Sequence, residues 1–253
     1  MNTLAQAVEI GGRRRVSSVG HAVVVAVRAL RDVATWGPLL IGQMRRLGVD
    51  SVGIAAFIAV FTGIVLALLS SYVFTGAVPL YFVGALVGKT IMMELGPVLT
   101  GLALAGRVGA NIAAELGTMR VTEQVDALET LAYDPNAYLI VPRVLAGILM
   151  FPMVTALAMA IGVVSGWITS INLLDLSTVE FVKGLKQFYV FKDIWFGLVK
   201  AASFGGAITL LGAINGLRSQ GGAEGVGRAT TRAVVQGACA ILVLDAFWAV
   251  VLL

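Results

Sequence analysis

The decisive stretch of this chain covers residues 94–143 and reads ELGPVLTGLALAGRVGANIAAELGTMRVTEQVDALETLAYDPNAYLIVPR. Within it an apolar span ends, a polar amphipathic segment follows, and a second apolar span begins. This layout is expected of a membrane domain that lays one short helix on its cytoplasmic face, where a partner can bind it. Nothing else in the chain could bind or hydrolyse a nucleotide. We therefore expect another subunit to supply the energy for any work that the protein does.

The composition indicates an integral membrane protein. Of the 253 residues, 58% are apolar and 13% are charged, and the mean hydropathy is +0.94. A soluble globular domain is usually about a quarter charged, so lipid must replace water over much of this surface. The net charge of +4 does not predict binding to nucleic acid, because the basic residues cluster at the ends of spans. The chain contains one histidine, His21, and one cysteine, Cys239, so we expect no metal site. Because the sequence has no enzymatic motif, we also expect no catalytic residue.

Five segments are long and apolar enough to cross a bilayer, which takes about 20 predominantly apolar residues. They are residues 52–72, 78–105, 144–168, 194–217 and 233–253. Asp50 and Ser51 are candidate caps of the first segment. The glycine-rich stretch 216–227 is the one flexible-looking linker. The sequence thus predicts an all-α integral membrane fold, with a five-helix membrane domain over residues 49–253.

The N-terminal region, residues 1–48, is predicted to be retained in the cytoplasm. Within it we expect a helix over residues 16–40 that lies in the membrane interface. Val23, Val27 and Leu30 share one helical face, whereas Arg28 and Arg31 lie off it. This segment is too short and too basic to span, and an amphipathic helix of this kind lies at the interface. A re-entrant hairpin is the alternative that the residues leave open.

Lysine and arginine in the short loops predict the orientation, because cytoplasmic loops carry an excess of both. With the N-terminus inside and the C-terminus outside, the outer side receives only Lys183, Lys186 and Lys192. The cytoplasmic side then holds the arginines, namely Arg13, Arg14, Arg15, Arg28, Arg31, Arg45, Arg46, Arg107, Arg120, Arg143, Arg218, Arg228 and Arg232.

Four charged side chains lie inside the predicted spans, and their formal charges cancel: Lys89, Glu94, Lys200 and Asp245. A lone charge at mid-bilayer costs at least ~2.5–3.5 kcal/mol, so such residues usually pair or face water. Lys200 and Asp245 lie ~9 Å and ~12 Å from the outer ends of their helices, which matches them in depth. Glu94 is deeper, unless an outer elbow near Pro79 raises it. A salt bridge that fixes helix packing and a polar station in a substrate cavity or coupling network fit these residues equally well.

The polar segment 111–131 has helical periodicity. An apolar stripe begins at Ile112 and continues with a shift in phase at Val121. Proline disfavours helical geometry in the residue before it, so Pro135 ends the helix. Because the chain has no enzymatic motif, we favour a coupling helix for a soluble partner over a plain surface helix. Its polar residues are Glu115, Arg120, Glu123, Asp126 and Glu129.

Residues 84–90 read GALVGKT, which looks like a phosphate-binding loop. That motif needs four residues between its glycines, and here the glycines enclose three. The segment also lies inside an apolar span. We therefore interpret Gly84 and Gly88 as a helix contact between small residues. The same spacing recurs at Gly162/Gly166 and Gly212/Gly216.

At this point the sequence closely resembles the MlaE/YrbE permease family, the membrane subunits of ABC systems that move lipids across the bacterial envelope. The resemblance covers roughly residues 45–253. The matching motifs are ELGP at 94–97, AGRVG at 105–109, AELGTMR at 114–120, VTEQVDAL at 121–128, VPR at 141–143 and GRATTRAV at 227–234.

The resemblance implies a homodimer with a lipid cavity at its interface, formed by protomers that each have an interfacial helix and five spans. It implies a cytoplasmic ATP-binding subunit, which would hold ATP and Mg, docked on residues 112–130. It also implies a periplasmic MCE-domain protein, often with a small STAS-like cytoplasmic subunit. In the family, charged residues at the positions of Glu94, Lys200 and Asp245 sit together in the membrane. Family members often carry a basic residue before the glutamate where this chain has Met93, so we expect Arg107 or Lys89 to supply that charge.

The resulting hypothesis is a permease of the bacterial inner membrane that exchanges phospholipid with an MCE protein and maintains outer-membrane lipid asymmetry. Leu66, Leu69 and Val73 are expected to contact the acyl chains of the lipid. The alternative is an ion-coupled secondary transporter or channel that uses the intramembrane charges and needs no ATPase. A third interpretation is a passive scaffold that anchors other subunits.

Overall fold

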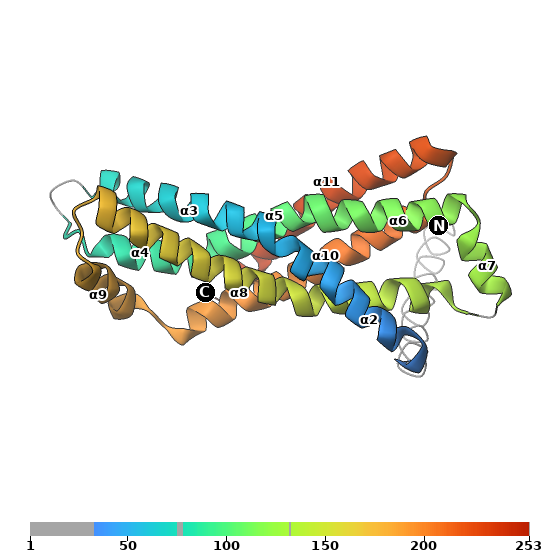
Figure 1. The fold of residues 1–253 in the computed structure, drawn as a ribbon, viewed down its shortest axis with the longest axis horizontal. Coiled ribbons are helices and arrows are strands. Elements are labelled where there is room, and N and C mark those ends of the chain that lie inside the picture. Colours follow the sequence, from blue (N-terminus) through green and yellow to red (C-terminus); the bar gives the residue numbers. More distant parts are fainter. Residues whose placement is uncertain (1–32, 75–77, 132, 253) are drawn as a thin grey trace, which may run out of the picture.

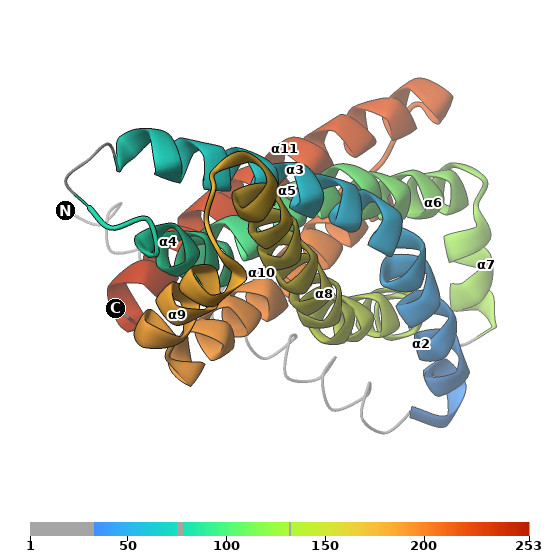
Figure 2. The same cartoon turned by 60° about the vertical axis from the view of Figure 1, so that its left-hand side comes forward.

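The computed structural model describes residues 33–74, 78–131 and 133–252, and in this part of the chain helices alone form the regular structure. The helices run roughly along one long axis (Figure 1). Helices α4 and α9 lie at one end of the molecule, and α6, α7 and the start of α2 lie at the other. A turned view keeps α9 beside α4 at the same end (Figure 2). The molecule is thus a bundle of long helices with polar segments at both ends.

Five helical segments of the described chain are long and apolar enough to cross a membrane, which confirms the predicted membrane fold. All begin earlier than expected except the second, which begins at Phe82 rather than at residue 78. The turn before Phe82 is closed by its amide, which donates to the carbonyl of Pro79 over 3.1 Å. The segments are Gly37–Val73, Phe82–Val121, Ala137–Leu173, Phe191–Leu217 and Gly222–Val251.

The first segment consists of α2, Val33–Leu47, and α3, Val52–Val73, joined by a 3-10 turn at Val49–Ser51. Most of the interfacial helix predicted at 16–40 lies outside the described residues. The part that is described packs α2 against α8. Of the two candidate caps, Ser51 is the N-cap residue of α3, but its side chain makes no capping hydrogen bond, and Asp50 lies in the 3-10 turn before it. Instead the Ser51 hydroxyl donates backwards to the carbonyl of Leu47 over 2.6 Å.

The second segment is a rod of five consecutive pieces. Three α-helices, α4, α5 and α6, alternate with two π-helical turns. Such turns shift the faces that the following residues present, and they often mark functional sites. Glu94 lies in the first turn and Arg107 in the second. In chain order the pieces are Phe82–Thr90, Ile91–Leu95, Gly96–Leu104, Ala105–Gly109 and Ala110–Val121.

The polar segment predicted as one helix over 111–131 is two helices. Helix α6 ends at Val121, and α7 covers Gln124–Thr130. Between them Glu123 adopts a left-handed backbone conformation with φ of 60°, which no α-helix can include. The shift in phase of the apolar stripe at Val121 is the sequence sign of this break. Helix α7 also ends before the Tyr133–Pro135 stretch that was expected to stop it.

Helices α8 to α11 complete the chain. They cover Val141–Leu173, Thr178–Phe188, Phe191–Leu217 and Gly222–Leu252, and a π-helical turn at Asn136–Ile140 precedes α8. Helix α9 begins with a capping box, in which Ser177 accepts from the amide of Glu180 over 3.2 Å. Hydrogen bonds from Ser177 lower the pKa of Glu180. The predicted linker 216–227 is mostly helical, because Gly221 and Gly222, both at positive φ, turn the chain directly from α10 into α11.

Small residues let these helices approach closely. The three glycine pairs at small-xxx-small spacing all lie at helix contacts: Gly84 faces α9, Gly166 faces Val87 and Gly63, and Gly212 faces the carbonyl of Gly109. One close approach joins α8 and α10, where Gly147 and Gly205 face one another. A Cβ on either glycine would meet the carbonyl oxygen of the other. Close backbone packing of this kind is a main source of helix association in lipid.

Replacing Gly205 with alanine should destabilise the bundle by about 1–3 kcal/mol, because the added methyl would overlap the Gly147 carbonyl, which is backbone and cannot rotate away. Denaturant unfolding of the detergent-solubilised protein measures this loss. The matched control is Gly227→Ala, where a Cβ would meet nothing within 4 Å. Equal stability of the two variants would contradict the proposed contact.

Candidate functional site: an intramembrane charge triad and a polar pocket

The centre of the bundle holds an ionic triad. The Lys200 ammonium lies 2.7 Å from Oε1 of Glu94 and 2.7 Å from Oδ1 of Asp245. It donates a hydrogen bond to Glu94, whereas its contact with Asp245 is an ion pair without hydrogen-bond geometry. The Lys200 side chain is fully buried, and those of Glu94 and Asp245 are 38% and 23% exposed. The triad therefore carries one net negative charge and is open on its carboxylate side.

Three separate elements bring the triad together. Lys200 comes from α10, Asp245 from α11, and Glu94 from the π-helical turn of the second segment. Because that segment begins at Phe82, Glu94 is ~18 Å along it, against ~14 Å for Lys200 from Phe191. The later start and the turn after Pro79 thus remove most of the depth mismatch between Glu94 and Lys200. The Lys200 ammonium also lies over the Phe196 ring, 4.5 Å from its centroid.

The two other candidates of the predicted network lie elsewhere. Lys89 is 3.8 Å from Asp193, at the α4–α9 end of the molecule. Arg107 donates to the hydroxyl of Ser51, at the junction of α2 and α3. Neither supplies the positive charge beside Glu94 that the resemblance led us to expect. Lys200 alone provides it among the described residues.

The residues predicted for the coupling helix separate into two groups. Glu115, on α6, faces the bundle and pairs with Arg143 at 3.0 Å and with Arg46 at 3.5 Å. Arg120 and Asp126 form an ion pair at 2.5 Å that joins α6 to α7. The remaining two, Glu123 and Glu129, are exposed, and their side chains have no ionic partner among the described residues.

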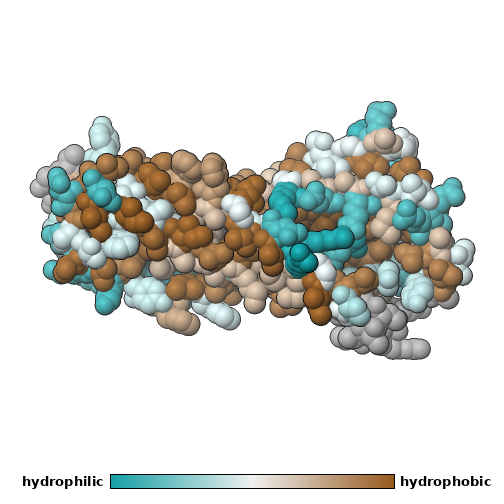
Figure 3. Space-filling view, in the orientation of Figure 1, coloured by the Kyte–Doolittle hydropathy of each residue, from teal (hydrophilic) through white to brown (hydrophobic). Residues whose placement is uncertain are grey.

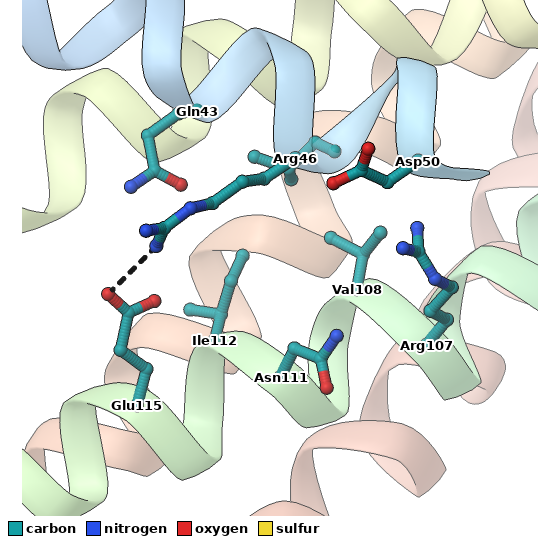
Figure 4. Close-up of a pocket in the computed structure, with 9 residues that line it drawn as sticks. Gln43, Arg46, Asp50, Arg107, Val108, Asn111, Ile112 and Glu115 are labelled. Atoms are coloured by element: carbon teal, nitrogen blue, oxygen red, sulfur yellow. Dashed lines mark ion pairs between the residues drawn. The ribbon is translucent and has the colours of Figure 1, made fainter.

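A polar pocket, which the sequence analysis did not identify, lies between α2 and α6. It has a volume of about 300 Å³. In Figure 4 the Arg46 side chain crosses the opening toward Glu115, and the Arg107 guanidinium points toward the segment that carries Asp50. Hydrophilic residues gather around a hollow in this region, beside a broad apolar surface (Figure 3). The only sequence sign was arginine at the ends of two neighbouring spans.

The predicted acyl-chain contacts do not form one cavity in the described structure. Leu66 is half-buried and packs into the core beside α4 and α9, whereas Leu69 and Val73 lie on the exposed face of α3. An apolar groove of about 430 Å³ runs instead between α3 and α8, lined by Val60, Ile64, Ile161, Val164 and Ile168. Large apolar side chains are also exposed on α3 and α11, including Tyr72 at 79% and Val250 at 86%. Surfaces of this kind contact lipid or another protein.

Replacing Lys200 with methionine should cost about 3–5 kcal/mol of stability, because it leaves two carboxylates together without their cation. Denaturant unfolding in detergent measures the change. The control is the triple variant Glu94→Gln/Lys200→Met/Asp245→Asn, which removes all three charges and should recover most of the loss. A triple variant as unstable as the single one would show that Lys200 acts through packing instead of charge.

Known proteins resemble the chain over most of its length. A family model described as Permease MlaE matches residues 40–251. The chain is 41% identical over 219 residues to a probable ABC transporter permease protein of Rickettsia prowazekii, covering 87% of this chain and 85% of that protein. It is 35% identical over 233 residues to the intermembrane phospholipid transport system permease protein MlaE of Haemophilus influenzae, covering 92% and 89%. These matches confirm the resemblance carried by the motifs at 94–128, and the chain belongs to the MlaE family of permeases.

Proposed function

We propose that this multi-pass membrane protein is the permease subunit of an ATP-driven phospholipid transporter in a bacterial inner membrane. Its substrate would be glycerophospholipid, exchanged with a periplasmic MCE-domain protein to maintain outer-membrane lipid asymmetry. The Haemophilus relative is named an intermembrane phospholipid transport system permease, which supports this substrate class. The names of the Rickettsia relatives support an ATP-binding partner, because ABC permeases work with such a subunit.

One observation carries the mechanism: the second segment is a continuous helical rod from Phe82 to Val121. The rod contains Glu94 of the triad and ends in the polar α6–α7 hairpin. A partner that grips this hairpin would therefore move the triad through helical backbone, with no flexible linker between. The Arg120–Asp126 ion pair links α6 to α7 across the elbow of the hairpin. ATP and Mg would be bound by the partner, which would press on α7.

The exposed apolar faces of α3 and α11 favour a homodimer, with phospholipid held between the protomers. The open, negatively charged side of the triad would be a polar station in that cavity. The arginine-rich α6–α7 end would face the cytoplasm and α9, with its lysines, the periplasm, by the excess of basic residues on the inner side. A STAS-like subunit would bind at the cytoplasmic end.

The ion-coupled alternative has less support. It would use the open carboxylates of Glu94 and Asp245, but Lys200 already compensates both of them at 2.7 Å. The Rickettsia relative of this chain is also named an ABC transporter permease.

Reversing the charge of Glu129 on α7 should weaken binding of the ATPase subunit by about tenfold or more, since an exposed carboxylate that meets a basic partner would then repel it. Co-purification of the tagged permease with its ATPase measures the loss. Insertion and folding should be unchanged, because Glu129 has no ionic partner within the described chain.

Glu224→Lys is the matched control, an exposed carboxylate at the start of α11, outside the α6–α7 hairpin. It should retain the ATPase at the wild-type level. Full ATPase recovery with the Glu129 variant, or equal loss with both variants, would contradict docking on α7.

A further inference from the structure

We propose that the pocket between α2 and α6 binds the phosphodiester of a phospholipid head group, as a loading site separate from the triad. This inference rests on the proposed function, in which phospholipid is the substrate. It adds that the pocket, and not the triad, recognises the phosphate of that lipid. The occupant is one class of ligand, a lipid whose phosphate enters the pocket while its acyl chains stay in the membrane.

The charges around the pocket suit a phosphodiester. Arg46 and Arg107 supply two guanidinium groups, which bind phosphate oxygens in a forked geometry. Asp50 lines the same pocket and makes no ion pair of its own among the described residues. Leu47 and Val108 line the same pocket and offer apolar contact to the glycerol and the first methylene groups. The volume of about 300 Å³ lies within the range of ligand pockets.

The depth of the pocket fits a head group. Arg107 lies 25 residues after Phe82, or ~38 Å along the second segment, and a hydrocarbon core is only about 30 Å thick. Asp50 lies ~35 Å before the end of α3 at Val73 by the same measure. Both charged groups therefore reach the head-group layer at the α6–α7 end, while the exposed apolar side chains of α3 extend from there into the membrane.

Glu115 behaves as an internal stand-in for the phosphate. It pairs with Arg46 at 3.5 Å across the opening, with both side chains largely exposed. A second pocket of about 330 Å³ lies on the other side of this ion pair and is lined by Arg46, Glu115 and Arg143. The Arg143 side chain is only 5% exposed, and its Nε is buried without a hydrogen-bond partner.

The Arg46–Glu115 ion pair can therefore break without leaving Glu115 unpaired, because Arg143 lies 3.0 Å from the same carboxylate. Taken together, Arg46, Arg107 and Arg143 face only Asp50 and Glu115. The surroundings of the two pockets thus have one positive charge in excess, which a phosphodiester with one negative charge would balance.

The test uses the purified full chain in detergent, with binding of dioleoyl-phosphatidylglycerol followed by native mass spectrometry. Dioleoylglycerol, which has the same chains but no phosphate, is the comparison ligand, and inorganic phosphate alone is a third arm. The wild type should prefer phosphatidylglycerol to dioleoylglycerol. The Arg46→Gln/Arg107→Gln variant should bind the phospholipid about tenfold or more weakly, since it loses both charged hydrogen-bond donors. The control Arg228→Gln changes an exposed arginine of α11 and should bind as the wild type does.

Glu115→Gln separates this effect from misfolding, because it should act in the opposite direction. It frees Arg46 and should tighten binding of phosphatidylglycerol several-fold, whereas general damage to the fold would weaken that binding.

Equal affinity of the wild type and the double arginine variant for phosphatidylglycerol would overturn the proposal, as would equal binding of dioleoylglycerol and phosphatidylglycerol by the wild type. Binding of inorganic phosphate without binding of phospholipid would overturn the assignment to a lipid. If the pocket does not bind phosphatidylglycerol but the chain still transports phospholipid with its ATPase, only the pocket proposal is overturned. If the pocket binds the lipid but the chain and its ATPase do not transport it, only the proposed function is overturned.

Discussion

The structure depends on one buried charge. Lys200 lies at the middle of an apolar bundle, with no exposed surface, and two carboxylates from other helices compensate it. A cation in that position without partners would be expelled or would lose its proton, because hydrocarbon cannot solvate it. The requirement for Glu94 and Asp245 therefore fixes the relative depth of three helices at once. Glu94 lies in the π-helical turn at Ile91–Leu95, and a turn of this kind shifts the face on which its residues lie.

Close packing of small residues carries this constraint to the rest of the bundle. Helix α10 holds Lys200, and one face of it meets α8 at Gly147 and Gly205 with the backbones almost in contact. Through Gly212 the same helix meets Gly109 in the π-helical turn before α6, and through Gly216 it meets Ala113 and Leu116 on α6. Interfaces of this kind have little room to slide, so displacement of α6 reaches α10 and the triad directly. The molecule thus has a rigid path between its polar hairpin and its charged centre.

Much of this fold could be predicted from the sequence, because the signals that matter in lipid are long and local. Stretches of about 20 apolar residues marked all five spans, and the cost of a buried charge marked Glu94, Lys200 and Asp245 as candidates. The grouping of these three came from family resemblance, since depth along an isolated helix placed Glu94 differently. Lys89 and Arg107 were expected beside Glu94 because family members often carry a basic residue where this chain has Met93, and in the structure they contact Asp193 and Ser51 instead. The break at Glu123 was missed because a left-handed residue other than glycine leaves little trace in a sequence.

The central claim is that the chain is a permease without its own source of energy, moved through the α6–α7 hairpin. It is tested most directly by reconstituting the purified chain in liposomes with a fluorescent phospholipid and an acceptor MCE-domain protein. We expect transfer of the lipid only when the ATPase subunit and ATP are both present. Transfer at the same rate by the chain alone, with no ATPase in the liposomes, would contradict the account.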